Sequence, residues 1–316
     1  MNTVDAPLFT QPQAWSGRDD GPGPEHARWH SSIALDTAPT SGAALIGFAS
    51  DEGVERNGGR QGAAKGPEEL RKALGGLALH DDFPRTDTGT ITTQSDDLEG
   101  AQQELSDRVR ELAAAGNLVV VLGGGHETSF ATHRGVREAV GPMGIINFDA
   151  HFDLRRADRP TSGTPFRQIA DLYGGDGFAY CVLGISKPNN TRVLFDEARA
   201  LGITTVLDTE LADASPVEAA EVALKCIPEE GPIHLSIDLD VLPASVAPGV
   251  SAPAALGVSY ANIRAMAQAV AATGRIALVD VVELNPEFDI DARTAKAAAR
   301  LIDDIVVAHA GAVAKQ

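Results

Sequence analysis

Short, continuously apolar segments alternate with helix-like patterns along most of this chain, and this alternation limits the possible folds more than any other feature. The apolar segments span residues 43–48, 118–122, 144–148, 179–185, 204–207, 233–237 and 276–282. The helical patterns span residues 67–77, 98–115, 129–140, 192–201, 217–226, 260–273 and 293–309. Strands that are apolar on both faces are typical of parallel sheets covered by helices on both sides. The sequence therefore predicts an α/β fold with a parallel sheet.

No linker-like stretch interrupts this pattern after about residue 40 of the 316. We therefore expect a single domain over residues 39–316 rather than two smaller ones. Residues 1–38 are rich in Pro, Gly and polar side chains, which predicts a loosely ordered lead-in draped over the body. Trp15 and Trp29 in this lead-in are interpreted as packing anchors.

Charge and composition limit the environment and the partners. The net charge of −18 repels nucleic acid and anionic membranes, so we expect neither as a partner and favour a small-molecule substrate. No apolar run approaches the roughly 20 residues of a membrane span, and the N-terminus does not resemble a signal peptide. Cys181 and Cys226, the only cysteines, are interpreted as buried free thiols in a reducing cytoplasm rather than as a disulfide.

A run of metal-competent side chains occupies every second position after the apolar segment 144–148. Asp149, His151 and Asp153 belong to the sequence NFDAHFD at residues 147–153. An extended chain points residues i, i+2 and i+4 to one face. This run is therefore expected to direct two carboxylates and one imidazole toward one point.

Other strand ends offer matching groups. Asp238 and Asp240 follow the segment 233–237, His126 follows a Gly-Gly-Gly turn after 118–122, and Glu283 follows 276–282. Ligands of open α/β folds gather at the carboxyl ends of the strands. These residues are therefore expected to share one site.

The number of ligands indicates two metal ions. One ion rarely uses four carboxylates and two imidazoles, whereas two divalent ions sharing carboxylates do, and their charge balances that of four Asp. Such dinuclear sites produce a hydroxide nucleophile at neutral pH. The oxygen-rich ligand set favours Mn²⁺, with Zn²⁺, Co²⁺ or Ni²⁺ as alternatives.

Simpler interpretations exist for single motifs. An Asp-x-Asp pair occurs by chance in acidic chains, and a glycine-rich turn after a strand can bind phosphate. The turn before His126 matches neither common phosphate-binding pattern, so we interpret it as a tight turn that presents His126. His133 is expected on a helix surface away from the metals. His30, His80, His234 and His309 are interpreted as structural.

Several segments resemble the signature motifs of the ureohydrolase (arginase/agmatinase) superfamily. They are GGGHE at 123–127, NFDAHFDLR at 147–155, SIDLDVLPASVAPGVSAPAALG at 236–257, DVVELNPEFD at 280–289, and RNGGRQGA at 56–63 followed by Gly66 and Pro67. The resemblance extends from residue 43 to the C-terminus. It implies a three-layer α/β/α sandwich around a mostly parallel eight-stranded sheet, in a protein that is commonly oligomeric.

The resemblance also implies roles for the candidate ligands. One Mn²⁺ would be held by His126, Asp149, Asp153 and Asp238. The second would be held by Asp149, His151, Asp238 and Asp240, so that Asp149 and Asp238 bridge the two ions. Glu283 would pair with the guanidinium or amidinium group of the substrate.

The branch of the superfamily is indicated by the residues downstream of Asp153. Guanidine-cleaving members carry a histidine, proposed as a proton shuttle, where this chain has Ser162 or Phe166. The segment SGTPF at 162–166, with LGIS at 183–186 and the pair Asn190 and Thr191, most resembles the formimidoylglutamase branch. That branch hydrolyses N-formimidoyl-L-glutamate to L-glutamate and formamide in histidine degradation.

The implied substrate has two carboxylates, so an acidic protein must provide local cations. Arg155 lies two residues after Asp153, Arg60 lies in a glycine-rich loop, and Arg167 follows Phe166. A guanidinium can bind a carboxylate through two hydrogen bonds. These arginines and Thr164 are the candidate substrate contacts, and a solvated surface position is the alternative for each arginine.

The expected reaction is metal-assisted amidine hydrolysis. A hydroxide between the ions would attack the formimidoyl carbon while Glu283 orients the amidinium. Asp153, Ser162 or a water would deliver the proton to the leaving amine. The alternatives are a guanidino-acid or agmatine ureohydrolase that releases urea, a related metal-dependent deacetylase, and a metal-binding relative without catalysis.

Overall fold

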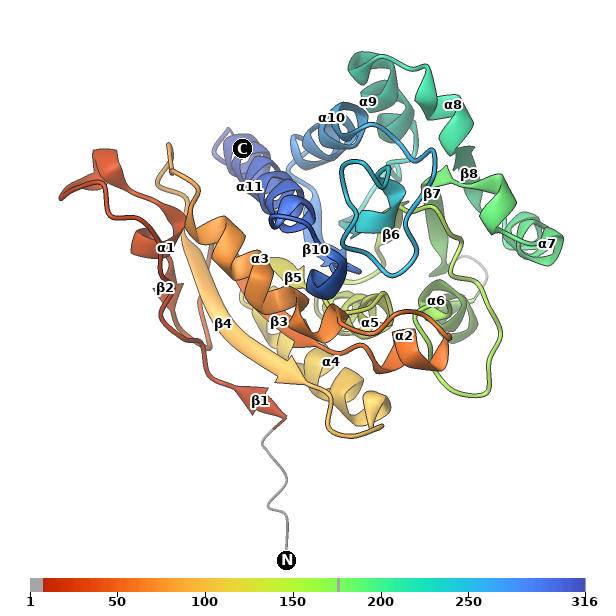
Figure 1. Ribbon diagram of the computed structural model, residues 1–316, viewed down its shortest axis with the longest axis horizontal. Coiled ribbons are helices and arrows are strands. Elements are labelled where there is room, and N and C mark those ends of the chain that lie inside the picture. Colours follow the sequence, from red (N-terminus) through yellow and green to blue (C-terminus); the bar gives the residue numbers. More distant parts are fainter. Residues whose placement is uncertain (1–7, 175–176, 316) are drawn as a thin grey trace, which may run out of the picture.

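A computed structural model describes residues 8–174 and 177–315, and its centre is one large sheet between two layers of helices (Figure 1). The strands are β1 (Phe9–Thr10), β2 (Ala34–Leu35), β3 (Ala43–Ala49), β4 (Arg85–Thr92), β5 (Leu118–Leu122), β6 (Gly144–Phe148), β7 (Ala179–Ile185), β8 (Thr204–Leu207), β9 (Ile233–Asp238) and β10 (Ile276–Val282). The α-helices are α1 (Trp29–Ser32), α2 (Glu52–Arg56), α3 (Gly66–Gly75), α4 (Leu98–Ala114), α5 (Thr128–Val140), α6 (Pro165–Tyr173), α7 (Arg192–Ala200), α8 (Asp208–Ala212), α9 (Pro216–Lys225), α10 (Tyr260–Ala271) and α11 (Arg293–Val313).

The strand order is β1-β4-β3-β5-β10-β9-β6-β7-β8, with β2 also pairing with β4. The eight strands from β4 to β8 along this order are all parallel to their neighbours. The two-residue strand β1 is antiparallel to β4, and β2 is parallel to it. The predicted three-layer sandwich around a mostly parallel eight-stranded sheet is confirmed, with two short strands added at one edge.

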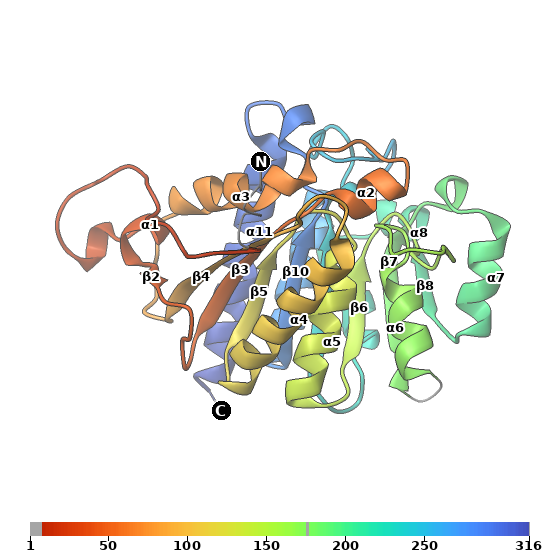
Figure 2. The same ribbon diagram turned by 90° about the horizontal axis from the view of Figure 1, so that it is seen from below.

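The two helical layers bury opposite faces of the same strands. Helices α3, α9, α10 and α11 cover one face, and α4, α5 and α6 cover the other (Figure 2). In β5, Val120 and Leu122 belong to the apolar cluster beneath the first layer, whereas Val119 and Val121 belong to the cluster beneath α4 and α5. Alternate side chains of a strand point to opposite faces, so a strand covered on both sides is apolar throughout.

The pattern of apolar segments did not predict strand β4, because its sequence, RTDTGTIT, is polar although most of it is buried. Its polar groups are used in contacts with α3. The guanidinium of Arg71 donates to both carboxylate oxygens of Asp87, at 2.8 and 3.0 Å, and to the hydroxyl of Thr90 at 2.9 Å. A buried strand whose polar groups bind a partly buried arginine does not need an apolar sequence.

The described part of the lead-in, residues 8–38, carries β1, α1 and β2 along the β4 edge, and its first seven residues lie outside the described part of the chain. The division near residue 38 stays a prediction. Trp29 is fully buried and stacks on Trp15, with ring centroids 6.3 Å apart. The predicted packing role of both tryptophans is confirmed.

The prediction of two free thiols is wrong, because Cys181 and Cys226 form a disulfide in the structure. Cys181 lies in β7, and Cys226 follows α9 on the same apolar cluster. Their Cα atoms are 5.8 Å apart, within the range that a disulfide spans. A separation of 45 residues offers no local sequence signal for this pairing.

Replacing Arg71 with Ala should lower the free energy of unfolding by about 3 kcal/mol, because it leaves the buried Asp87 carboxylate without its ion-pair partner. Lys72→Ala is the matched control on the same helix, since Lys72 pairs with Glu68 and Glu69 at the surface and should cost less than about 1 kcal/mol. Urea denaturation of both variants measures the difference. Equal losses would contradict a structural role for the Arg71 pair.

Candidate metal centre

The four central neighbours of the sheet, β5, β10, β9 and β6, carry the candidate ligands at their carboxyl ends. His126 follows β5, and Glu283 follows β10. Asp238 ends β9, and Asp149 follows β6. The chain order of these strands differs from their order in the sheet, so the topology brings distant sequence motifs to one edge.

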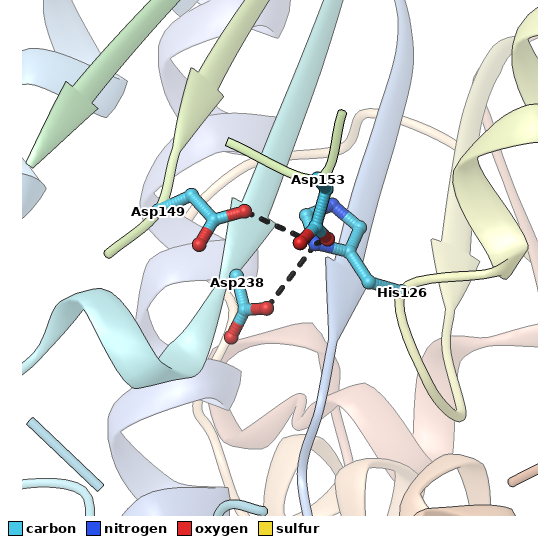
Figure 3. A group of neighbouring side chains, drawn as sticks. All are labelled: His126, Asp149, Asp153 and Asp238. Atoms are coloured by element: carbon cyan, nitrogen blue, oxygen red, sulfur yellow. Dashed lines mark ion pairs between the residues drawn. The ribbon is translucent and has the colours of Figure 1, made fainter. Parts of the chain in front are cut away.

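The first cluster surrounds Nδ1 of His126. This atom lies 2.9 Å from Oδ2 of Asp153 and 3.2 Å from Oδ2 of both Asp149 and Asp238 (Figure 3). None of these contacts has hydrogen-bond geometry, so the buried nitrogen is left without a partner. One imidazole lone pair facing three carboxylate oxygens fits a divalent cation, and these four ligand atoms lie within 4.8 Å of one another.

The second cluster surrounds Nδ1 of His151. It lies 3.1 Å from Oδ2 of Asp240 and 3.6 Å from Oδ1 of Asp149. Asp149 thus offers one oxygen to each cluster, as a bridging carboxylate would. Asp238 lies in the first cluster, and its Oδ1 accepts the backbone N–H of Asp240 at 2.8 Å. Sharing of Asp238 between two ions stays a prediction.

The backbone from Asp149 to Asp153 does not stay extended as expected. Strand β6 ends at Phe148, and the chain bends at Ala150 and His151. Asp153 then adopts a left-handed conformation with φ of 50°, as Glu283 does with φ of 67°. Such conformations cost free energy in residues other than glycine and gather at functional sites. The three side chains therefore meet through a bent loop, not through strand alternation.

Asparagines hold this loop in place. Asn190 donates to the carbonyl of Ala150 at 2.8 Å and accepts the N–H of Phe152 at 3.2 Å. Asn147 donates to Oδ2 of Asp149 at 3.0 Å. The sequence offered Asn190 only as part of a resemblance, and no local pattern indicates that it binds the loop.

The glycine turn before His126 is required by close packing. A Cβ atom on Gly124 would lie 1.8 Å from the carbonyl oxygen of Ser50. The next carboxylate, Glu127, is fully buried and accepts the N–H of Gly53 at 3.0 Å. This contact fixes α2 beside the site and was not recognised in the sequence. The turn serves to present His126, as predicted.

Burial and like charges raise the pKa values of several carboxyl groups in the metal-free protein. Burial and the charges of Asp240 and Asp149 hold the pKa of Asp238 well above its usual range. Burial and the charge of Asp149 raise the pKa of Asp153. For Asp149 burial acts in the same direction, but the adjacent imidazoles of His126 and His151 outweigh it and lower the pKa to about 2.

The pKa values of the two imidazoles are raised as well, because the surrounding carboxylates favour their charged forms. Burial alone would lower the pKa of His151, but Asp240 and Asp149 raise it to about 12. The pKa of His126 is likewise raised well above its usual range, since the three surrounding carboxylates outweigh burial. Protons therefore provide the positive charge that this cluster of acids needs when no metal is bound.

A cavity of about 310 Å³ opens onto the cluster. Its lining includes the ligands His126, His151, Asp153, Asp238 and Asp240, together with Glu283, Arg60, Arg155, Ser162, Asn57, Asn190 and Ser251. Thr164 and Arg167 are not part of this lining. The hydroxyl of Thr164 bonds within its own turn, to Thr161 and Gln168.

Only one of the three candidate arginines presents a guanidinium without a protein partner among the described residues. Arg60 donates to the carbonyls of Val250 and Ser251 and lies over the Phe288 ring. Arg167 pairs with Asp171 and Glu197. Arg155 lines the cavity and, within residues 8–174 and 177–315, forms no side-chain hydrogen bond or ion pair. Sequence alone could not separate these cases, because the partners lie elsewhere in the chain.

Comparisons with known proteins agree with this arrangement. The sequence model of the Arginase family matches residues 41–308. A formimidoylglutamase of Corynebacterium efficiens is 50% identical over 302 residues, which cover 94% of this chain and 96% of that protein. A formimidoylglutamase of Rhodococcus jostii is 47% identical over 308 residues, which cover 95% of this chain and 96% of that protein.

Solved structures with the same fold include a Trypanosoma cruzi formiminoglutamase with Mn²⁺. It has a TM-score of 0.81 and 29% identity, and the match covers 90% of this chain and 98% of that one. A formimidoylglutamase of Bacillus subtilis has a TM-score of 0.82 over 89% of this chain and 91% of its own. Its identity of 22% supports the fold alone.

We expect the affinity for Mn²⁺ to fall as the pH falls. The pKa of His151 is raised to about 12 and that of His126 well above its usual range, so a metal ion must displace protons from both imidazoles. Lower pH increases the competition from protons and therefore raises Kd. Equilibrium dialysis at about pH 6 and about pH 8 measures this dependence. A Kd that is constant over this range would contradict the proton-filled cluster.

Proposed function

Because the chain belongs to the arginase family, we propose that it hydrolyses N-formimidoyl-L-glutamate to L-glutamate and formamide with two Mn²⁺ ions. The observation that carries this proposal is the high identity to formimidoylglutamases over nearly the whole chain. The converged acids and imidazoles support the metal requirement. Among guanidine- and amidine-cleaving activities, hydrolysis of an amidine fits the residues of this cavity best.

The cavity lacks the extra imidazole that guanidine hydrolysis would be expected to use. Among the described residues, the only histidines in its lining are His126 and His151, and both are candidate metal ligands. Phe166 is fully buried, with its ring edge against His126 and its face on Tyr180. The Phe166 ring therefore packs against His126 and carries no exchangeable proton.

The metal ligands proposed here are His126, Asp149, Asp153, Asp238, His151 and Asp240. When bound, two divalent ions lower the pKa of water and so provide a nucleophile at neutral pH. The protein's part is to fix the ligands before the substrate enters. The bonds of Asn190 and Asn147 to the loop, and the strand ends beneath it, support this preorganisation.

We assign binding of the amidinium head to Glu283. Its carboxylate lines the cavity, and its Oε1 accepts the N–H of His126 at 2.8 Å, which directs the group toward the metal cluster. Burial and the charges of Asp238 and Glu127 raise the pKa of Glu283 well above its usual range. A bound amidinium cation would offset these charges and favour the ionised carboxylate.

We assign delivery of the proton to the leaving amine to Asp153, with Ser162 as the second candidate. Asp153 lines the cavity and would relay the proton while it also binds metal. The hydroxyl of Ser162 also lines the cavity and accepts a hydrogen bond from Asn57 at 3.2 Å. Both residues line the cavity, and the Ser162 hydroxyl carries a proton of its own.

We assign binding of the glutamate carboxylates to Arg155. Arg155 is an exposed residue that lines the cavity, and its guanidinium has no protein partner among the described residues, whereas those of Arg60 and Arg167 are bonded to protein groups. In a chain with a net charge of −18, a local cation is needed to attract a dianionic tail. Arg60 and Thr164 would then support the walls of the site without reaching the carboxylates.

We also propose that the protein works as a cytoplasmic homo-oligomer without nucleic acid or membrane partners, since its substrate is an intermediate of amino-acid breakdown. The net charge supports this choice of partners. Across residues 8–174 and 177–315, no helix combines the length and apolar character that a membrane crossing requires. Light scattering of the purified protein tests the oligomeric state.

A substrate panel with Mn²⁺ tests the reaction itself. The panel contains formimidoylglutamate, arginine, agmatine and guanidinobutyrate, and both formamide and urea are measured. We expect formamide and glutamate from the first compound and no urea from the others. Urea released from any guanidine compound at a comparable rate would replace the proposal with a ureohydrolase activity, and no turnover at all would favour a metal-binding relative.

Arg155→Met should raise KM for formimidoylglutamate by about 10- to 100-fold, the equivalent of about 1.5–3 kcal/mol for lost charged hydrogen bonds, with a smaller change in kcat. Arg156→Met is the matched control. Arg156 is the neighbouring residue, is exposed, and pairs with Glu197 outside the cavity. Steady-state kinetics of both variants provides the test, and the same KM in both would remove Arg155 from the site.

A further inference from the structure

A second polar cluster is buried behind His126, on the side away from the cavity. It consists of Ser129 and Thr132 on α5, His234 and Ser236 on β9, and Asp280 on β10, all with no exposed surface. None of these residues lines the cavity. Buried polar groups cost free energy unless they are hydrogen-bonded, so a cluster of this size next to a metal ligand calls for a role.

One carboxylate oxygen receives most of the hydrogen bonds. Oδ2 of Asp280 accepts from the hydroxyls of Ser129 and Thr132, both at 2.9 Å, and lies 2.8 Å from Nε2 of His234. A separate branch continues toward the metal site. Oγ of Ser129 lies 3.2 Å from Oγ of Ser236, which lies 3.0 Å from Nε2 of His126.

The number of available protons determines which group donates in each hydrogen bond between Asp280 and His126. A serine hydroxyl has a single proton to donate. Ser129 donates its proton to Asp280, so its oxygen can only accept from Ser236. Ser236 has then used its own proton, so its oxygen can only accept from Nε2–H of His126. The proton of a neutral His126 is thereby held on Nε2, and Nδ1 carries the lone pair that faces Asp149, Asp153 and Asp238.

The same reasoning assigns the donors in the hydrogen bonds that join Asp280, His234 and His133. Nε2–H of His234 points to Asp280, so Nδ1 of a neutral His234 accepts from His133, whose Nδ1 lies 3.2 Å away. Burial, then His234 and Arg137, lower the pKa of His133 well below its usual range and keep that ring neutral. The expectation that His133 lies on a helix surface is therefore wrong: it is buried and packs on His234, although it does not reach the ligands.

We propose that Asp280 is a positioning residue that acts through Ser129 and Ser236 to hold the proton of the neutral His126 ring on Nε2, so that Nδ1 is the nitrogen that binds Mn²⁺. Metal-binding histidines commonly donate their other N–H to a carboxylate, a carbonyl or water, and the loss of such partners weakens metal binding by about 10- to 100-fold. Here two hydroxyls separate the ring from the carboxylate. The proposal rests on the proposed metal site, and it does not depend on which substrate is cleaved.

Removing the Ser129 hydroxyl changes which group donates in the hydrogen bond between Ser236 and His126. Without Ser129 as an acceptor, the hydroxyl of Ser236 is free to donate to Nε2 of His126. A neutral ring would then carry its proton on Nδ1, where it competes with the metal ion. Thr132 bonds to the same Asp280 oxygen at the same distance but forms no hydrogen bond with Ser236 or His126 among the described residues. Ser129→Ala and Thr132→Val are therefore a matched pair.

The test is a Mn²⁺ titration of the full-length metal-free protein, with free Mn²⁺ measured by electron paramagnetic resonance. We expect two ions per chain in the wild type and in Thr132→Val, with equal affinities. In Ser129→Ala, one of the two ions should bind about 10- to 100-fold more weakly, and the other, at His151, should be unchanged. The proposal would be overturned if Ser129→Ala bound Mn²⁺ with the same affinities as Thr132→Val, whether both variants bound it as the wild type does or both bound it more weakly.

Two further variants guard against loss of the fold. Ser236→Ala breaks the same branch at its other hydroxyl and replaces Ser129→Ala if that protein does not fold. Ser129→Thr retains the hydroxyl and should bind both ions as the wild type does. A wild type that binds fewer than two Mn²⁺ ions would contradict the proposed metal site itself, so the two failures are distinguishable.

Discussion

Four buried aspartates converge at one edge of the sheet, and their mutual repulsion is the constraint on which the rest of the site depends. Without metal, protons retained by His126 and His151 balance part of this charge. Two divalent cations would balance it fully and would hold the carboxylates in their ionised forms. The free-energy cost of placing these four aspartates together is therefore coupled to metal binding. The fold must hold them in place in both the metal-free and the metal-bound protein.

The sheet topology meets this requirement. The central strands β5, β10, β9 and β6 are adjacent although their chain order differs, and each contributes a polar group just where its apolar sequence ends. Positive φ angles at Asp153 and Glu283 indicate backbone strain directly at the site. Asn190, Glu127 and the apolar layers on both faces provide the contacts that hold these conformations. The contacts around the site thus stabilise the strained backbone conformations within it.

Much of this arrangement could be predicted from the sequence because its signals are local. Apolar runs indicate buried parallel strands, and acids directly after them indicate a ligand site at the sheet edge. Long-range contacts left no such signal. Strand β4 is polar because Arg71 of α3 satisfies it, and His133 is buried because His234 is its partner. The pairing of Cys181 with Cys226 likewise depends on how α9 packs on the sheet.

The same limit applies to the arginines around the cavity. The sequence offers Arg60, Arg155 and Arg167 as candidates and favours Arg155 for its position after Asp153, but only the tertiary contacts show that Arg60 and Arg167 are bonded to protein groups. In the proposed function, specificity would therefore depend on which arginine remains available to the substrate, whereas the proposed metal ligands belong to motifs that the sequence displays directly.

The central claim is that both ligand clusters form one dinuclear site that shares Asp149. A crystal structure of the Mn²⁺-loaded protein, with anomalous diffraction measured at the manganese edge, tests it most directly. We expect two manganese peaks about 3.5–4 Å apart, with one oxygen of Asp149 bound to each ion. A single peak, or two ions without a common Asp149 ligand, would contradict the claim.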